Sequence, residues 1–214
     1  MSEAVAHAPP AEIHKPWHTA ERQRAAMQFG FWIFLATEML FFGGLFLFYA
    51  TLRVLDTVGL AAGSHEADLT FGTANTVILT TSSVAIVIAE RALKAGWTRW
   101  ARWCLAATLA LAVAFLVVKG FEYAKDLHEH LWPGPGFKLP EPGARRFWSF
   151  YWTATGIHAI HIIIGIGLVA RLLWLDRAGL LSRRWMGVEV TTLYWHFVEL
   201  VWLTLYPLIY LAGR

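Results

Sequence analysis

Five stretches of this chain, each close to 20 residues long, carry few or no charged side chains. A helix rises 1.5 Å per residue, so about 20 apolar residues cross the roughly 30 Å hydrocarbon core of a bilayer. Composition agrees, because 57% of the residues are hydrophobic and only 15% are charged, against about a quarter in soluble domains. The sequence therefore predicts an all-α membrane protein with five transmembrane helices, at about 29–53, 70–93, 100–124, 147–174 and 189–212.

The distribution of basic residues predicts how these helices are oriented. Eleven of the 18 Lys and Arg residues lie before the first apolar stretch, between the second and third (residues 90–102), or between the fourth and fifth (residues 171–189). Since cytoplasmic segments are enriched in Lys and Arg, we expect the N-terminus in the cytoplasm and the C-terminus outside. Residues 1–28 lack the apolar core of a signal peptide. They are predicted to form a polar tail ahead of a single membrane domain, 29–214.

Five ionisable side chains lie deep within the predicted spans, away from their ends, and mark the candidate functional site. They are Glu38, His158, His161, His196 and Glu199. An ionised carboxylate at the centre of a membrane helix costs about 2.5–3.5 kcal/mol, so such groups must be buried, paired or used. Glu38, His161 and Glu199 fall at a similar depth on three helices, and the other two histidines lie within one turn of them. We expect Glu38 to be hydrogen-bonded or protonated and to react with a hydrophobic carbodiimide.

Three kinds of function remain open for this polar cluster from the residues alone. His158 and His196 could clamp a haem, but a di-iron site needs more histidines, and a single cysteine, Cys104, excludes iron–sulfur sites within the chain. The second kind of function is a proton relay or a transporter, although the sequence shows neither the repeated halves nor the broken helices that are typical of transporters. In the third, which the pattern favours, the polar groups join helices to one another or to a lipid headgroup. No nucleic-acid-binding pattern is present.

Five stretches, in this order, resemble subunit III of the haem–copper oxidases. They are 29–44 with Glu38, Asn75-Thr76 before an apolar run, Phe115-Leu116 followed by Glu122-Tyr123, 155–165 with both histidines, and 194–202 with Glu199. The resemblance covers about residues 25–213. Longer members have seven helices, of which this chain would begin at the third, and five-helix forms occur in bacteria. Members often have Asp at the position of Glu199 and a neutral polar residue at that of Lys119, so no role is carried onto Lys119.

The resemblance implies an accessory, non-redox subunit of a proton-pumping terminal oxidase that reduces oxygen to water in a bacterial inner membrane. It implies no catalytic residue, metal or cofactor in this chain. Haem and copper would belong to partners in the complex, namely a directly contacting catalytic subunit I and a copper-bearing subunit II, with a small subunit IV beside them. Cytochrome c is the expected electron donor. The alternatives are a quinol oxidase, a nitric-oxide-reductase-associated protein and, more weakly, a proton-coupled transporter.

The resemblance further implies a cleft that holds structural phospholipid. It would open where a two-helix group, the first two spans, diverges from a three-helix bundle. Arg53 and Arg171 lie at helix ends, where headgroups are found, so they are the candidate phosphate partners. Trp32 and Trp195 are the candidate wall residues. In this family, subunit III would also support proton uptake and the durability of the catalytic subunit.

Overall fold

The computed structural model describes residues 19–178 and 185–213. Over these ranges the chain forms helices and no strands, in the order α1 (Ala20–Leu55), α2 (Thr57–Glu66), α3 (Leu69–Lys94), α4 (Thr98–His128), α5 (Pro142–Arg177), α6 (Trp185–Tyr206) and the π-helical turn η2 (Pro207–Leu211). Among the described residues, α1, α3, α4 and α5 are long and apolar enough to cross a membrane. The predicted all-α membrane class is therefore confirmed.

The fifth predicted span corresponds to α6, which is not among those four helices. α6 contacts α1, α3 and α5, and its Tyr194, Trp195 and Trp202 are buried. A helix in such an inner position meets neighbouring side chains on several sides, so its polar groups can find partners within the protein. The number of spans and the orientation of the chain stay predictions.

Helix ends differ from the predicted ones where capping residues set them. α1 begins at Ala20, because the Thr19 hydroxyl accepts a hydrogen bond from the Arg22 amide at 3.2 Å. Nine residues of the predicted tail 1–28 are thus helical, and residues 1–18 of that tail lie outside the described residues. The short helix α2 was not predicted. It begins after Asp56, whose carboxylate accepts from the Gly59 amide at 2.9 Å.

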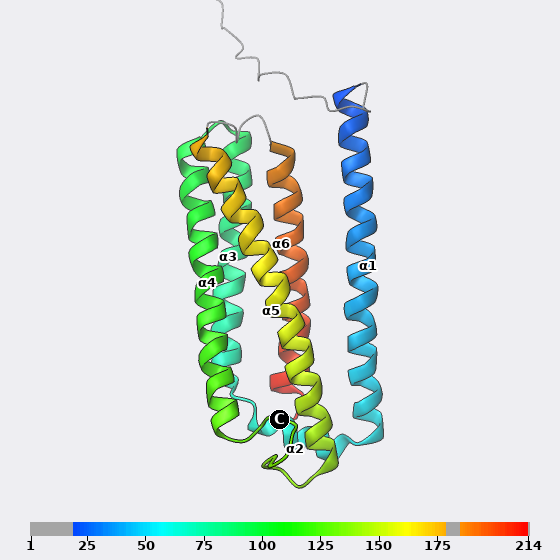
Figure 1. Ribbon diagram of the computed structural model, residues 1–214. Helices are drawn as coiled ribbons and strands as arrows, with labels where there is room; N and C mark the ends of the chain where they lie inside the picture. Colours follow the sequence, from blue (N-terminus) through cyan, green and yellow to red (C-terminus); the bar gives the residue numbers. More distant parts are fainter. Residues whose placement is uncertain (1–18, 179–184, 214) are drawn as a thin grey trace, which may run out of the picture.

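The predicted division into two helices and three helices is wrong. α3 was assigned to the two-helix group, but it packs along α4 and against α6. α1 alone therefore stands apart from a bundle of α3, α4, α5 and α6 (Figure 1). Small side chains explain the close packing of α3, because Ser82 and Ala89 are buried in it, and Thr108 of α4 reaches the Ser82 carbonyl.

The C-terminal segment, residues 207–212, holds one end of α1 to the bundle. Pro207 has no amide hydrogen, and the π-helical turn ends the regular α-helical ladder. Carbonyl groups at a helix end need donors from elsewhere, and side chains of α1 and α2 supply them. Tyr49 donates to the Leu208 carbonyl at 2.6 Å, Ser64 to that of Ile209 at 2.6 Å, and Arg53 to that of Ala212 at 3.0 Å.

Candidate functional site: buried polar groups between the helices

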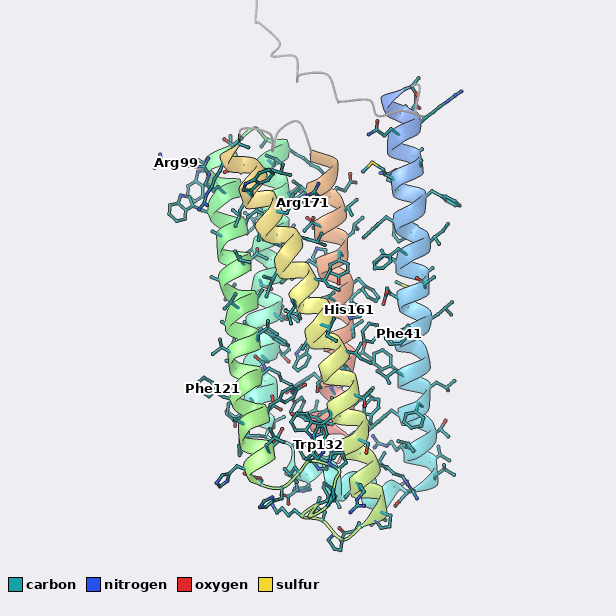
Figure 2. The ribbon with its side chains drawn as sticks, in the orientation of Figure 1. Phe41, Arg99, Phe121, Trp132, His161 and Arg171 are labelled. Carbon is teal, nitrogen blue, oxygen red and sulfur yellow. The ribbon has the colours of Figure 1, made fainter. Side chains whose placement is uncertain are left out.

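Glu38 and His161 join α1 to α5. Glu38 Oε2 lies 3.1 Å from His161 Nε2, and His161 Nδ1 lies 2.9 Å from the Ile157 carbonyl oxygen. Figure 2 shows His161 on the side of α5 that faces α1. A carbonyl oxygen only accepts, so Nδ1 carries a hydrogen. The contact between Nε2 and the carboxyl oxygen then needs a second proton, on either the imidazole or the carboxyl group. The predicted partnership between Glu38 and His161 is present.

Glu199 has different partners, so it does not join the Glu38 pair. The Ser83 hydroxyl of α3 donates to Glu199 Oε2 in a short hydrogen bond, and it lies 2.8 Å from His196 Nδ1. Because the hydroxyl hydrogen is used, His196 Nδ1–H donates to Ser83. His196 and Glu199 also lie within 3.4 Å of each other, which agrees with their predicted placement on one helix face. This cluster joins α3 to α6.

His158 does not share a partner with His161. Its ring stacks on Trp202, with centroids 5.2 Å apart, and meets the edge of Phe115. Neither ring nitrogen has a hydrogen-bond partner within the described ranges. Residues three apart on a helix differ by about 60° in direction, and that angle separates the core of the bundle from the face toward α1. A haem clamped by His158 and His196 does not fit, since Trp202 and Phe115 cover the His158 ring.

Two hollows lie between α1 and the bundle, one on each side of the Glu38 level. The α1–α6 hollow, of about 260 Å³, is lined by Met27, Gln28, Phe31, Trp32, Glu189, Val190 and Leu193. The α1–α5 hollow, of about 310 Å³, is lined by Leu45, Phe48, Leu52, Arg146, Ser149, Phe150 and Thr153. Both are largely apolar, and a basic side chain borders the second.

The four residues predicted to contact lipid differ in their exposure and in their hydrogen-bond partners. Trp32 lines the α1–α6 hollow, and Arg171 is exposed toward the end of α5 (Figure 2). Arg53 is exposed but donates to the Ala212 carbonyl. Trp195 is only 1% exposed and donates its indole N–H to Ser82 at 3.1 Å. Trp195 therefore does not line an open cleft, because it packs against Gly165 inside the bundle.

A second buried group of ionisable side chains was not predicted. This lysine cluster comprises Lys119, Glu122 and Asp126 of α4, Tyr151 of α5 and Tyr210 of η2. Lys119 is 2% exposed and donates to Glu122 at 3.0 Å, to Tyr151 at 3.1 Å and to Tyr210 at 3.0 Å. Its ammonium also lies 4.6 Å from the centre of the Tyr151 ring, within cation–π distance.

The sequence did contain a signal for the lysine cluster. Lys119, Glu122 and Asp126 are spaced by three and four residues, which places them on one face of a helix. Both Lys119 and Glu122 fall near the end of the predicted span 100–124, where a Lys side chain commonly extends to the headgroups. The structure buries them instead, because Tyr151 and Tyr210 bring hydroxyl groups from two other elements. Phe121, by contrast, points outward from α4 (Figure 2).

Two of the ion pairs near the α2 end of the bundle have short contacts. Asp68 accepts from Lys125 at 2.5 Å, and Glu66 accepts from Lys138 at 2.6 Å. Partial burial raises the pKa of Asp68, but the Lys125 ammonium and the Thr70 amide outweigh it and hold that pKa below its usual value. The Glu66 carboxylate raises the pKa of Lys138. Each pair connects segments far apart in the sequence.

Comparison with known proteins identifies the family. Residues 12–214 match the family described as cytochrome c oxidase subunit III. The chain belongs to that family. The cytochrome c oxidase subunit 3 of Thermostichus vulcanus is 32% identical over 187 residues, which cover 86% of this chain and 87% of that protein. A quinol oxidase subunit 3 from Bacillus spizizenii is 30% identical, with 86% of both chains covered.

A third relative spans almost the whole of both chains. The cytochrome bo(3) ubiquinol oxidase subunit 3 of Pseudomonas aeruginosa is 28% identical over 221 residues, covering 100% of this chain and 99% of that protein. This member of the cytochrome c oxidase subunit III family is thus a membrane subunit of a respiratory oxidase complex, as its resemblance implied. Within the described residues, no group of three or more His, Cys, Asp or Glu side chains could hold a metal ion.

Proposed function

We propose that this chain is an accessory, non-redox subunit of a proton-pumping cytochrome c oxidase in a bacterial inner membrane. Its role is to hold phospholipid beside the catalytic subunit, to support proton uptake and to prolong the life of that subunit during turnover. Haem and copper belong to subunits I and II, and subunit I is the direct partner. Subunit IV completes the complex.

The observation that carries the lipid role is the separation of α1 from the other long helices. α1 makes polar contacts with the bundle through Glu38 and with the C-terminal segment, and its Phe42 packs against Phe197 beside Glu38. The α1–α6 and α1–α5 hollows flank the Glu38 contact, and their largely apolar linings suit acyl chains. Phospholipid headgroups need a cation near the membrane surface. Arg146 borders one hollow, and Arg171 is exposed toward the opposite end of α5.

The proposal is tested by preparing the complex with and without this chain. We expect the two preparations to have the same haem and copper spectra and the same initial rate of oxygen reduction per haem. The preparation lacking the chain should contain fewer tightly held phospholipids by mass spectrometry and should lose activity sooner during turnover. Stoichiometric haem or copper that disappears with this chain would contradict the non-redox role. An unchanged lipid content would contradict the lipid role.

Single substitutions then locate the lipid within the intact complex. Trp32→Ala opens the α1–α6 hollow, and Arg171→Ala removes an exposed cation toward the end of α5. Arg146→Ala does the same at the α1–α5 hollow. We expect each to lower the amount of retained phospholipid, whereas Arg99→Ala on the far side of the bundle (Figure 2) should not.

A quinol oxidase is the second candidate for the parent complex. It is favoured by the Pseudomonas relative, which is named as a ubiquinol oxidase subunit and matches this chain over its entire length. Cytochrome c is favoured by the relatives that share 31–34% identity and are named as cytochrome c oxidase subunits. Oxygen consumption by the purified complex, with reduced cytochrome c or with ubiquinol as the only donor, distinguishes the two.

A further inference from the structure

The lysine cluster has no part in the proposed lipid role, and its contacts require more hydrogens than the residues supply. Lys119 makes three contacts, with Glu122 Oε2 and with the hydroxyls of Tyr151 and Tyr210. Tyr210 OH also lies 2.6 Å from Glu122 Oε1. Tyr151 OH lies 2.9 Å from Glu122 Oε1 and 2.7 Å from Asp126 Oδ2. These are six polar contacts.

An ammonium group brings three hydrogens and each tyrosine brings one, so the cluster supplies five. All three Lys119 hydrogens point to separate acceptors, and Tyr210 uses its own on Glu122. Tyr151 has one hydrogen for two carboxyl oxygens. A contact of 2.7–2.9 Å between two oxygens is a hydrogen bond only if one of them carries a hydrogen. The sixth hydrogen must therefore be a proton on Asp126 or on Glu122.

The net charge of the lysine cluster independently requires the same single extra proton. With both carboxyl groups ionised, one ammonium would face two carboxylates, and the buried cluster would carry a net negative charge. Burying an uncompensated charge is strongly unfavourable, and all five side chains of the lysine cluster are at most 3% exposed. One added proton makes the cluster neutral and completes the six hydrogen bonds together.

We propose that the lysine cluster is a binding site for one exchangeable proton, shared by Asp126 and Glu122 through the Tyr151 hydroxyl. When Asp126 carries it, Asp126 donates to Tyr151 and Tyr151 donates to Glu122. When Tyr151 turns its hydrogen to Asp126, the proton lies on Glu122. Either arrangement conserves the six hydrogens and moves no other group.

Asp126 is the entrance to this proton site. It lies two residues before the end of α4, beside the exposed Lys125 and the half-buried Glu129. Other ionisable groups surround the cluster without contributing a hydrogen bond to it. They are Tyr123 on α4, which is bonded to Thr155, Asp68 before α3, which is paired with Lys125, His158 on α5, and Tyr206 at the end of α6, which is bonded to Thr73.

Infrared difference spectroscopy of the assembled oxidase complex tests the proposal directly. A protonated carboxyl group has a C=O stretching band that an ionised one lacks, and it shifts in heavy water. We expect spectra taken between neutral and alkaline pH to show the loss of one such band. Asp126→Asn should abolish that band, because the carboxamide N–H donates to Tyr151 in place of the carboxyl proton. Glu129→Gln is the matched control on the same helix and should retain it.

If the lysine cluster must stay electrically neutral, two further results are expected. A purely structural role for Asp126 would not predict them. Glu122→Gln removes the other carboxyl group, so Asp126 should ionise to balance Lys119 and the band should again be absent. Lys119→Gln removes the cation, so both carboxyl groups should be protonated and the band should grow. If Lys119→Gln fails to assemble, the two carboxamide variants still decide the question.

A thermal measurement gives an independent answer on the same preparations. Loss of the proton leaves the buried cluster charged, so the melting temperature of the wild-type complex should fall as the pH is raised. That of Asp126→Asn should fall less. Wild-type and Asp126→Asn complexes with identical infrared difference spectra would overturn the proposal, and so would identical melting profiles against pH.

Discussion

Within the described residues, Glu38 is the side chain that joins the middle of α1 to the bundle by a polar contact. Its carboxyl oxygen meets His161 Nε2, while Nδ1 of the same ring donates to the Ile157 carbonyl. One proton therefore has to lie between Glu38 and His161. The pair can stay neutral overall whichever group holds that proton, which reduces the cost of placing a carboxyl group inside a membrane helix.

Glu38→Gln should leave oxygen reduction mostly intact in the assembled complex. The glutamine amide can donate to His161 Nε2, so α1 stays attached, while the carboxyl group that we expect to react with a hydrophobic carbodiimide is lost. We expect less carbodiimide labelling of this chain, and changed lipid retention or faster inactivation on turnover. Oxygen consumption and labelling measure these. Abolished oxygen reduction in a fully assembled complex would favour a proton relay through Glu38.

Asp68→Asn should lower stability at neutral pH by less than about 1 kcal/mol, as is usual for an exposed ion pair. Asparagine can still cap α3, but it cannot pair with Lys125. The pKa of Asp68 is held low in the folded chain, so its stabilisation is present above the ordinary value of about 3.9. It is lost as the pH falls through the folded pKa. Melting curves of wild type and variant should therefore converge in acid, and a constant difference would contradict this.

At the scale of the helices, one glycine sets how closely α5 and α6 approach. A Cβ atom at Gly165 would lie 2.7 Å from the Trp195 ring, whereas at Gly167 it would meet nothing within 4 Å. Only Gly165 therefore faces α6. The difference arises because residues two apart on a helix point about 160° apart.

Gly165→Ala should destabilise the bundle by about 1–3 kcal/mol, the usual cost of overpacking. The Trp195 ring would have to move, and its hydrogen bond to Ser82 would weaken. Gly167→Ala is the matched control and should leave the stability of the bundle nearly unchanged. Thermal unfolding of the two complexes side by side measures the difference. Equal losses for both variants would mean that the α5–α6 contact is not set by Gly165.

The attachment of α1 by the C-terminal segment predicts a specific weak point. Tyr49→Phe removes the donor to the Leu208 carbonyl and keeps the ring packed on Phe150. Interhelical hydrogen bonds in membranes are worth about 0.6 kcal/mol on average and at most about 2 kcal/mol, so we expect a loss in this range. Thr51→Ala is the control, since its hydroxyl bonds only to its own helix at Leu47. A chain that melts at the same temperature in both variants would contradict the attachment.

Across the whole molecule, polar contacts between helices are concentrated on a few levels. One level, midway along the helices, holds the Glu38–His161 and Ser83–Glu199 contacts, and another is the lysine cluster at the α2 end. Between them, Phe115 packs against His158 and Trp202, and Trp202 also donates to the Thr76 hydroxyl. Among the described residues of α1, Glu38 belongs to the first of these levels, and Tyr49 and Arg53 bond to the C-terminal segment. The rest of α1 stands apart from the bundle (Figure 1). Two hollows lie beside it.

The sequence by itself determined the membrane class, the approximate place of each long helix and the family, because apolar length and local motifs depend on neighbouring residues in the chain. It also identified Glu38, His161, His196 and Glu199 as residues with buried polar partners. Only the tertiary structure decided which partners they have, that α3 belongs with α4 and α6, and that Lys119 lies in the core. Each of these depends on how the helices are rotated against one another. Successive residues of a helix differ by 100° in direction, so the sequence of one helix gives the relative directions of its own side chains. It does not give which of those directions faces a given neighbouring helix.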